Sequence, residues 1–168
     1  GGEPLLNKSL FKMASLAHSK RLSTQLFTNG LLIDEYISEI LDYFDFINVS
    51  FNAADAKEYH LAHNASPKLF EILIDNTTKL IETRGKFKKK LKISLSYICT
   101  KSNFKRIPDF IELANSIGAD DVFFRTLTCF DLPGFEDSQC LYIDDEEVVE
   151  VINSVTPSKG KMKIWSPK

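Results

Sequence analysis

Stretches with apolar residues at helical spacing alternate along the chain with short strand-like runs. The helical stretches are expected at residues 5–18, 34–43, 55–61, 66–83, 108–117 and 144–153. The strand-like runs are expected at residues 22–28, 46–51, 90–98 and 122–126, with one more at 161–165. Strands and helices that alternate with short links predict a parallel sheet wound by right-handed crossovers, and hence an α/β fold.

Glycines mark several of the expected element boundaries. Gly30 follows the first strand, where a left-handed strand exit favours glycine. Gly85 is expected to end the helix of residues 66–83, and Gly118 is expected to end the helix after it. Asp34 has the side chain of a helix N-cap and is expected to begin the second helix.

The predicted strands are divided by polarity. Side chains alternate across a strand, so every second residue points to the same face. The small or polar residues that share a face are Asn48, Ser50 and Asn52; Lys92, Ser94 and Ser96; Ser23, Gln25 and Asn29 together with Phe27; and Asp121 and Arg125 together with Phe123. Because helices must cover the apolar faces, these polar faces should line a common interior that holds a polar ligand or water. The alternative is a sheet covered on one side only, with its polar face in solvent.

Composition adds limits to this architecture. A chain of 168 residues suits one domain, and 43% hydrophobic with 26% charged residues is typical of a soluble globular protein. There is no signal-peptide pattern and no apolar run near the roughly 20 residues that span a bilayer, so we expect a cytoplasmic protein without a membrane partner. The net charge of -2 argues against an overall electrostatic grip on nucleic acid, and RNA is not an expected partner.

The three cysteines are too widely spaced for a disulfide framework or a compact metal motif. They are Cys99, Cys129 and Cys140. His60 and His63 share a helical face, but no third ligand joins them at a convincing spacing, so we expect a solvated pair. No metal ligand is therefore predicted in this chain.

Four segments resemble the radical S-adenosylmethionine (SAM) superfamily when they are taken in order. They are Gly1-Gly2-Glu3-Pro4 and the segments at residues 26–30, 47–52 and 119–125. Each stands at the C-terminal end of a strand, with helices between them. The resemblance covers about residues 1–127 and implies an incomplete radical SAM-type (β/α) barrel over residues 1–143. Residues 144–168 would then hold the last helix and the start of a C-terminal extension.

The resemblance also implies where SAM would bind. In that family Gly-Gly-Glu accepts hydrogen bonds from the SAM amino group, polar residues ending the fourth strand lie near the ribose hydroxyls, and a serine or a basic residue holds the carboxylate. The matching positions here are Gly1, Gly2 and Glu3 for the amino group, Ser50 and Asn52 for the ribose, and Ser96 and Arg125 for the carboxylate, with Thr28 and Asn29 as further candidates. The alternatives are that Gly-Gly-Glu-Pro is only a turn, that Thr28-Asn29-Gly30 is only a strand exit, and that Arg125 pairs with a neighbouring carboxylate.

One departure from the family is serious. Radical SAM activity needs a C-x-x-x-C-x-x-C loop that holds a [4Fe-4S] cluster, and this sequence does not contain it. We expect an N-terminal truncation, with the cluster ligands outside this chain, and no cleavage of SAM by this chain alone. The full-length parent would cleave SAM reductively, with an electron donor, and start radical chemistry on a small molecule or a peptide. No catalytic residue is identified in this chain.

Two rival functions remain open at this point. One is a cluster-free (β/α) barrel enzyme that binds a phosphate or sugar, although residues 132–135 (Leu-Pro-Gly-Phe) make a poor phosphate loop. The other is a non-catalytic module that only binds SAM. The stretch from Asp144 toward Trp165 resembles the region before the C-terminal extension of peptide-modifying members, which favours a peptide substrate. A missing first part of the barrel would also leave residues 22–28 as an unpaired edge strand, with a risk of aggregation.

Overall fold

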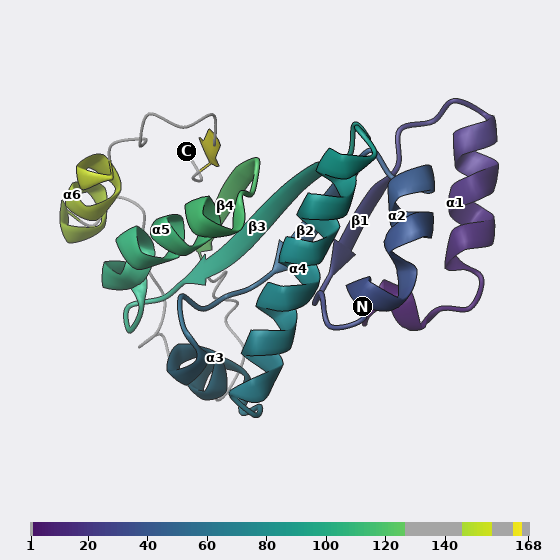
Figure 1. Cartoon of the computed structure of the whole chain (residues 1–168). Helices are drawn as coiled ribbons and strands as arrows, with labels where there is room; N and C mark the ends of the chain where they lie inside the picture. The colour runs from purple at the N-terminus through teal and green to yellow at the C-terminus, as the bar shows by residue number, and fades with distance from the viewer. Residues whose placement is uncertain (1, 127–145, 156–162, 166–168) are drawn as a thin grey trace, which may run out of the picture.

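Five parallel strands form one sheet in the computed structural model of the chain, which describes residues 2–126, 146–155 and 163–165 (Figure 1). The strands lie side by side in chain order and are β1 (Gln25–Thr28), β2 (Phe46–Ser50), β3 (Lys92–Cys99), β4 (Asp121–Thr126) and β5 (Lys163–Trp165). The register aligns Asn48 of β2 with Phe27 of β1 and with Ser94 of β3. The predicted α/β fold with a parallel sheet is confirmed.

Helices connect the strands, as the alternating pattern predicted. The α-helices are α1 (Leu10–Ser19), α2 (Ile37–Tyr43), α3 (Ala56–His63), α4 (Lys68–Lys86), α5 (Ile107–Ile117) and α6 (Glu146–Ser154), and the short 3-10 helices are η1 (Pro4–Leu6), η2 (Ile33–Tyr36) and η3 (Phe104–Arg106). The predicted helix at residues 5–18 is wrong in one respect, because it is divided into η1 and α1. The Glu3 carboxylate caps η1 by accepting from the Leu5 amide, and extended backbone at Asn7 ends it.

Two predicted helix boundaries were also wrong. Gly85 does not end its helix, because α4 continues through it to Lys86 and the Phe87 amide then bonds to the Thr83 carbonyl. Asp34 caps no helix, because it lies inside η2. The other two glycine predictions are confirmed, since Gly118 caps α5 at φ 87° and Gly30 leaves β1 at φ 81°.

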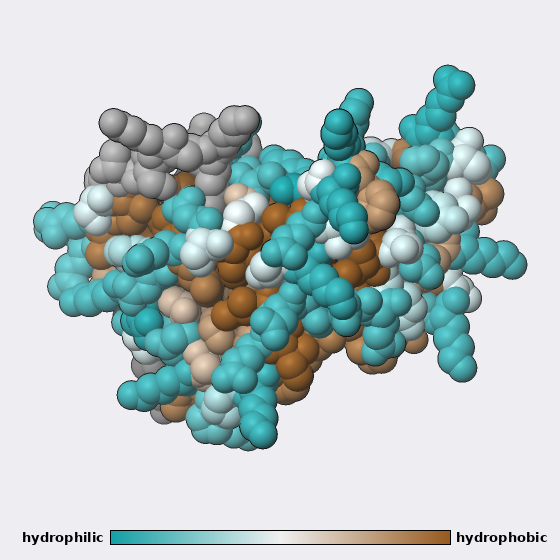
Figure 2. All heavy atoms as spheres, viewed as in Figure 1, coloured by the Kyte–Doolittle hydropathy of each residue, from teal (hydrophilic) through white to brown (hydrophobic). Residues whose placement is uncertain are grey.

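The hydrophobic core lies on the face of the sheet that the sequence marks as apolar. Helices α4 and α5 run along this face in Figure 1, and hydrophobic atoms show beside α4 in Figure 2 while hydrophilic side chains cover most of the surface. The fully buried core residues on the strands and on these two helices include Ile47, Val49, Ile93, Leu95, Leu73, Leu80 and Phe110. The packing leaves the opposite face of the sheet to small and polar residues such as Asn48, Ser94 and Ser96, and to the rings of Phe27, Phe46 and Phe123.

The strand order also defines the edges of the sheet. Among the described strands, β1 and β5 lie at the two edges, which confirms the expected edge position of β1. The predicted boundary at residue 143 falls in a part of the chain that the structure does not describe, as do Cys129, Cys140 and residues 132–135. None of the described helices combines the length and the hydropathy that a membrane crossing requires.

Candidate functional site

The polar face of the sheet is a lumen face with a depression in its surface. Asn48 is 2% exposed, and Ser94 and Ser96 of β3 are also buried, so this face does not simply meet bulk solvent. The depression has a volume of about 310 Å³. It is called the lumen depression here, and its lining residues are Gln25, Phe27, Phe46, Asn48, Phe123 and Arg125. Residues from β1, β2 and β4 thus converge as the alternation predicted.

Aromatic rings line much of the lumen depression. The ring centroids of Phe27 and Phe46 lie 6.2 Å apart, and those of Phe46 and Phe123 lie 6.4 Å apart. Strand β3 runs between β2 and β4, so the Phe46 and Phe123 rings approach one another over it. They can do so because the lumen-facing residues at the centre of β3, Ser94 and Ser96, are small.

Asn48 brings an unmet hydrogen-bonding requirement to the lumen depression. Its side-chain Nδ2 is buried and has no hydrogen-bond partner among the residues that the structure describes. Buried polar groups in folded proteins are nearly always paired, and an unpaired one typically costs about 1–3 kcal/mol. Asn48 is thus a lining residue of the lumen depression whose amide donor the described fold leaves unused.

Arg125 extends from β4 at the C-terminal side of the lumen depression. Its side chain is exposed, and no carboxylate of the described chain lies within ion-pair distance of it. The neighbouring Asp121 is engaged instead by the ammonium group of Lys92, at 2.5 Å. The ion pair considered for Arg125 from the sequence is therefore not formed among the described residues, and its guanidinium is available to an anionic ligand.

Ser50 and Asn52 lie at the C-terminal end of β2. Asn52 adopts a positive φ of 53°, which asparagine tolerates better than most residues, and its Oδ1 accepts from the Ile98 amide at 3.2 Å. The carbonyl of Ser96 accepts from the amides of Phe51 and Asn52. The backbone thus fixes the ends of β2 and β3 to each other, while the Ser50 and Asn52 side chains stay partly exposed at the rim of the sheet.

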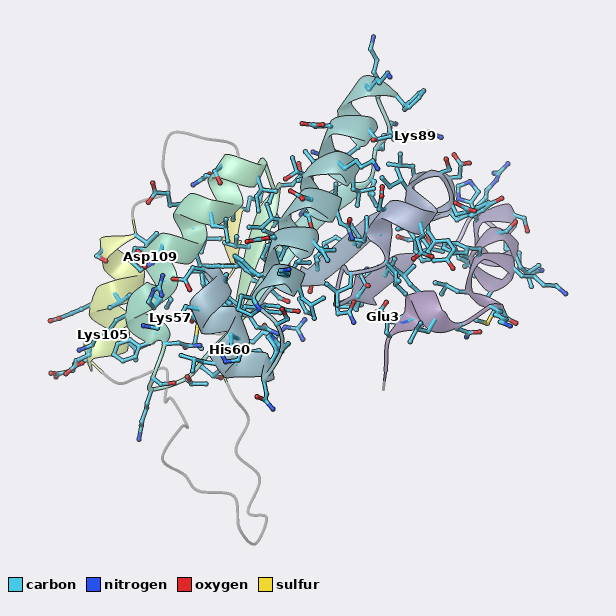
Figure 3. The ribbon with its side chains drawn as sticks, turned by 60° about the horizontal axis from the view of Figure 1, so that its bottom comes forward. Glu3, Lys57, His60, Lys89, Lys105 and Asp109 are labelled. Atoms are coloured by element: carbon cyan, nitrogen blue, oxygen red, sulfur yellow. The ribbon has the colours of Figure 1, made fainter. Side chains whose placement is uncertain are left out.

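Glu3 ties the start of the chain to the end of β1. One carboxylate oxygen accepts from the Thr28 hydroxyl at 2.7 Å and from the Leu5 amide at 3.0 Å. The other oxygen accepts from the Asn29 amide at 2.7 Å. Because a carboxylate oxygen can accept about two hydrogen bonds, the second oxygen retains capacity for one more donor. Figure 3 shows Glu3 beside the first turns of the chain, well apart from Lys57 and His60 of α3.

The remaining candidates near Glu3 differ in accessibility. Thr28 is buried, and its hydroxyl also accepts from the Gly30 amide at 3.1 Å. Asn29 is exposed and uses its Oδ1 to accept from the Leu31 amide. Gly2 is exposed with φ 110°, a conformation that favours glycine, and Gly1 lies outside the described residues. Thr28 therefore supports Glu3 and the turn, whereas Gly2 and Asn29 face outward.

A larger cavity of about 530 Å³ lies beside α3 and was not predicted from the sequence. It is called the α3 cavity here, and its lining includes Asn52, Lys57, Glu58, Leu61, Ile98 and Arg106. Asn52 and Ile98 belong to the lumen face, so the α3 cavity begins at the same rim that carries the predicted ribose residues. No local pattern marks it, because it forms only where α3 and η3 meet the ends of β2 and β3.

A polar network forms one wall of the α3 cavity. The buried Tyr97 hydroxyl donates to the Glu58 carboxylate, which also accepts from the Ala54 amide at 2.8 Å. Burial, followed by the hydrogen bond to Glu58, raises the pKa of Tyr97 above its usual value. Arg106 pairs with Asp55 at 2.8 Å and with Asp109 at 2.7 Å. The hydrogen bond to Asp55 is the main reason that the pKa of Arg106 is raised.

The described residues do not fit an iron-sulfur cluster. Cys99 is the described cysteine, and it is buried on the core side of β3 rather than on the lumen face. Burial raises the pKa of its thiol to about 12, whereas a cluster ligand must be a thiolate. No group of three or more His, Cys, Asp or Glu side chains in the described ranges could hold a metal ion. His60 Nδ1 instead lies 2.8 Å from the Ala65 carbonyl, and the His63 ring packs on Tyr59.

Curated proteins with similar sequences bear a common name. The chain is 30% identical over 125 residues to a PqqA peptide cyclase of Granulibacter bethesdensis, a match that covers 71% of the chain and 30% of that protein. It is 27% identical over 122 residues to a PqqA peptide cyclase of Gluconobacter oxydans, covering 73% of the chain and 33% of that protein. The chain thus spans about a third of the length of these relatives. No model of a protein family matches it.

Solved structures share the fold. SuiB of Streptococcus suis superposes with a TM-score of 0.76 at 16% identity, over 100% of this chain and 38% of that one. A domain of a pyruvate-formate lyase-activating enzyme from Bacteroides vulgatus superposes with a TM-score of 0.66 at 16% identity, over 98% and 94% of the two chains. The ordered motifs, the lumen face and these similarities agree, and the chain belongs to the radical SAM superfamily.

Proposed function

We propose that this chain is the SAM-binding part of an enzyme that cleaves SAM reductively to start radical chemistry on a peptide. The observation that carries the proposal is the lumen face, where a buried amide without a partner and an exposed guanidinium line a cavity beside the strand ends. Its relatives named PqqA peptide cyclase support a peptide substrate. The shared fold of SuiB, which has been solved with SAM and with its precursor peptide SuiA, is consistent with both ligands.

SAM would lie across the C-terminal rim of the sheet. The Ser50 and Asn52 side chains, which are partly exposed there, would bind the ribose hydroxyls. The Arg125 guanidinium would hold the carboxylate through a charge-assisted hydrogen bond. Ser96 would contribute less to that contact, because its side chain is 5% exposed.

The amino group of SAM would meet the start of the chain. The carboxylate oxygen of Glu3 that accepts from Asn29 can take one more donor, and Gly1 and Gly2 would add backbone carbonyls. Thr28 and Asn29 would act mainly by holding the Glu3 carboxylate in place. An ammonium group needs several acceptors, and this end of the chain would provide them.

The [4Fe-4S] cluster would be held by other cysteines. Cys99 has the wrong orientation and protonation state for a ligand, and the sequence has no C-x-x-x-C-x-x-C loop. SAM, when cleaved at such a cluster, supplies the radical that removes a hydrogen atom from the substrate. This chain's own residues would bind and orient SAM and shield it from water. An electron donor and a reducing compartment, which we propose is the cytoplasm, are also required.

Calorimetric titration of the intact protein with SAM tests the proposal. Arg125→Gln should weaken SAM binding about 10-fold to 100-fold, because hydrogen bonds to charged groups contribute about 1.5–3 kcal/mol. Lys12→Gln is the matched control, since it removes an exposed charge on α1 that lines neither the lumen depression nor the α3 cavity, and it should leave the affinity unchanged. Tight binding of a sugar phosphate in place of SAM would instead support a cluster-free barrel enzyme. If Arg125→Gln and Lys12→Gln changed the SAM affinity equally, the proposed role of Arg125 would be contradicted.

A further inference from the structure

A strongly basic segment lies at the end of the sheet opposite the proposed SAM site. Residues 84–92 run from the last turn of α4 to the start of β3 and contain no acidic residue. The segment is called the basic corner here, and its cations are Arg84, Lys86, Lys88, Lys89, Lys90 and Lys92. Figure 3 shows Lys89 well apart from Lys57 and His60 of α3. Because the whole chain has a net charge of -2, these six cations leave -8 on the rest of it.

Two cations of the basic corner serve the fold. Arg84 pairs with Asp120 and also donates to the Leu91 carbonyl at 3.0 Å. Lys92 pairs at 2.5 Å with Asp121, whose side chain is 1% exposed. These contacts join the end of α4 and the start of β3 to the start of β4, so both cations are committed to the structure.

The other lysines of the basic corner are available at the surface. Lys86, Lys88 and Lys90 are exposed and form no ion pair with any residue that the structure describes. Lys89 pairs with Asp42 at 2.6 Å, but the two side chains are 41% and 52% exposed, and such a pair is weak enough to exchange for another carboxylate. The dipole of α4 favours cations only in its last turn, so it accounts for Lys86 and not for the lysines that follow the helix.

One of these lysines occupies a position that favours glycine. Helix α4 ends in a Schellman motif, in which the Lys89 amide bonds to the Arg84 carbonyl at 3.0 Å. In the same motif the Lys88 amide bonds to the Gly85 carbonyl at 3.2 Å. Lys88 has a φ of 51°, in the left-handed region where a residue with a Cβ is strained. No side-chain contact of Lys88 within the described chain offsets this strain, which is consistent with a role for its ammonium group toward a partner.

A depression and an exposed ring complete the basic corner. The depression has a volume of about 400 Å³, and its lining includes Lys90, the buried Leu91 and Lys163 of β5. Phe87 is 62% exposed, and the ammonium group of Lys86 lies 5.8 Å from the centroid of its ring. The surface thus offers positive charge and an apolar contact together.

We propose that the basic corner docks an acidic segment of the peptide substrate that carries an apolar side chain among its carboxylates. This inference rests on the proposed function for the substrate being a peptide, and it adds a recognition site remote from the reaction. The carboxylates would bind the exposed lysines, and the apolar side chain would pack on Phe87. A short acidic peptide fits better than a nucleic acid, because a long polyanion would also meet the negative charge of the rest of the chain.

The length of β3 separates the two sites. Lys92–Cys99 has eight residues at about 3.3 Å each, so the ends of the strand lie roughly 23 Å apart. An extended peptide covers about 3.3–3.6 Å per residue, so its acidic segment must lie at least about seven residues from the residue that reacts. Docking at the basic corner would then raise the local concentration of the reacting residue at the rim without any contact to SAM.

Fluorescence anisotropy with the intact protein tests the docking. The probe is fluorescein-labelled Glu-Glu-Phe-Glu-Glu-Glu, and its control carries Gln in place of every Glu. The acidic probe should bind about tenfold or more tightly than the control, with an affinity that falls as NaCl is added. Equal affinities of the two probes would overturn the proposal. Tighter binding of a labelled oligouridylate of equal charge would also overturn it, because the surface would then suit a nucleic acid.

Two double variants place the binding at the basic corner. Lys88→Gln combined with Lys90→Gln should weaken the acidic probe about threefold to tenfold, because it removes two exposed ion-pair partners. Lys8→Gln combined with Lys12→Gln is the matched control, since it removes the same charge from exposed positions at the start of the chain, and it should leave the affinity unchanged. Equal losses in the two double variants would reduce the effect to net charge and would refute the docking site.

Two further measurements separate the apolar contact and the cofactor site. Phe87→Ala should weaken the probe that contains Phe and should not affect a probe with Ala in its place; an equal effect on both would contradict the apolar contact. The variant at Lys88 and Lys90 should bind SAM normally, and Arg125→Gln should bind the acidic probe normally. Failure of the unchanged protein to bind SAM, with the acidic probe still bound selectively, would count against the proposed function alone.

Discussion

Gly30 offers the sharpest test of how the turn after β1 is packed. The backbone there has φ 81°, and a Cβ at this position would lie 2.4 Å from Leu73 Cδ1 and 2.7 Å from Val49 Cγ1. Both neighbours are fully buried, in α4 and β2, so neither can move without disturbing the core. Gly30→Ala therefore combines backbone strain with steric overlap at the turn that carries Thr28 and Asn29.

The expected loss can be separated into these two parts. A left-handed conformation costs a residue with a Cβ about 1–2 kcal/mol, and overpacking a tight core costs about 1–3 kcal/mol. The sum for Gly30→Ala is about 2–5 kcal/mol of unfolding free energy. Gly118→Ala shares the strain, at φ 87°, but its Cβ would make only an ordinary 3.7 Å contact with Ile81, so it should lose about 1–2 kcal/mol. Gly85→Ala has neither problem and should gain about 1 kcal/mol as a helix substitution.

Urea denaturation followed by far-UV circular dichroism would measure all three variants against the unchanged protein. The midpoint should fall most for Gly30→Ala, less for Gly118→Ala, and rise for Gly85→Ala, with similar m-values throughout. If Gly30→Ala and Gly118→Ala lost the same stability, the steric part of the reasoning would be refuted. A loss for Gly85→Ala would contradict the continuous α4 helix.

Three further predictions concern titration and hydrogen bonding. Asp55 Oδ1 accepts from an amide at the start of α3, and this bond is the main cause that lowers its pKa below the usual 3.8. The stabilising effect of the Asp55 carboxylate is therefore present above pH 3.8 and is lost as the pH falls below that value. Thermal unfolding of Asp55→Asn should show a lower Tm than the unchanged protein at pH 6. Between pH 4 and pH 3 the Tm of the variant should fall by less than that of the unchanged protein. Burial raises the pKa of the Cys99 thiol to about 12, so iodoacetamide at pH 8 should alkylate Cys99 only when the protein is denatured. Peptide mapping checks this, and labelled Cys99 in the native protein would contradict its burial. Glu3→Gln places an amide donor against the Thr28 hydroxyl or the Asn29 amide, so it should lower the free energy of unfolding by about 1–3 kcal/mol in the urea assay. An unchanged urea midpoint would mean that Glu3 does not hold the turn.

The strands and their faces were predictable because strand periodicity is local. Alternation alone placed Asn48, Ser50 and Asn52 opposite Ile47 and Val49, and the structure puts the two aliphatic residues in the core and Asn48 in the lumen depression. The resemblance to radical SAM enzymes added the expected SAM-binding roles of the residues at the C-terminal ends of successive strands. Neither source required knowledge of contacts between distant residues.

The features that escaped prediction depend on such contacts. Glu58 reads as an ordinary helix residue, and only the fold brings the Tyr97 hydroxyl, 39 positions away, to its carboxylate. Gly85 was expected to end a helix by its identity, but α4 continues past it to Lys86, and the Phe87 amide still bonds to the Thr83 carbonyl. The orphaned Asn48 donor could be placed on a face from the sequence, but its lack of a partner is a property of the folded environment.

The two serines of β3 set how much room the interior of the sheet has. Valines at positions 94 and 96 would suit a buried strand, yet their methyl groups would fill the space over which Phe46 and Phe123 meet. The size of a ligand would then be governed by the volume that these two small side chains leave empty, in addition to the contacts that Ser96 itself makes. A change in the preferred ligand would therefore follow from a larger side chain at position 94 alone, without any change in the proposed SAM contacts.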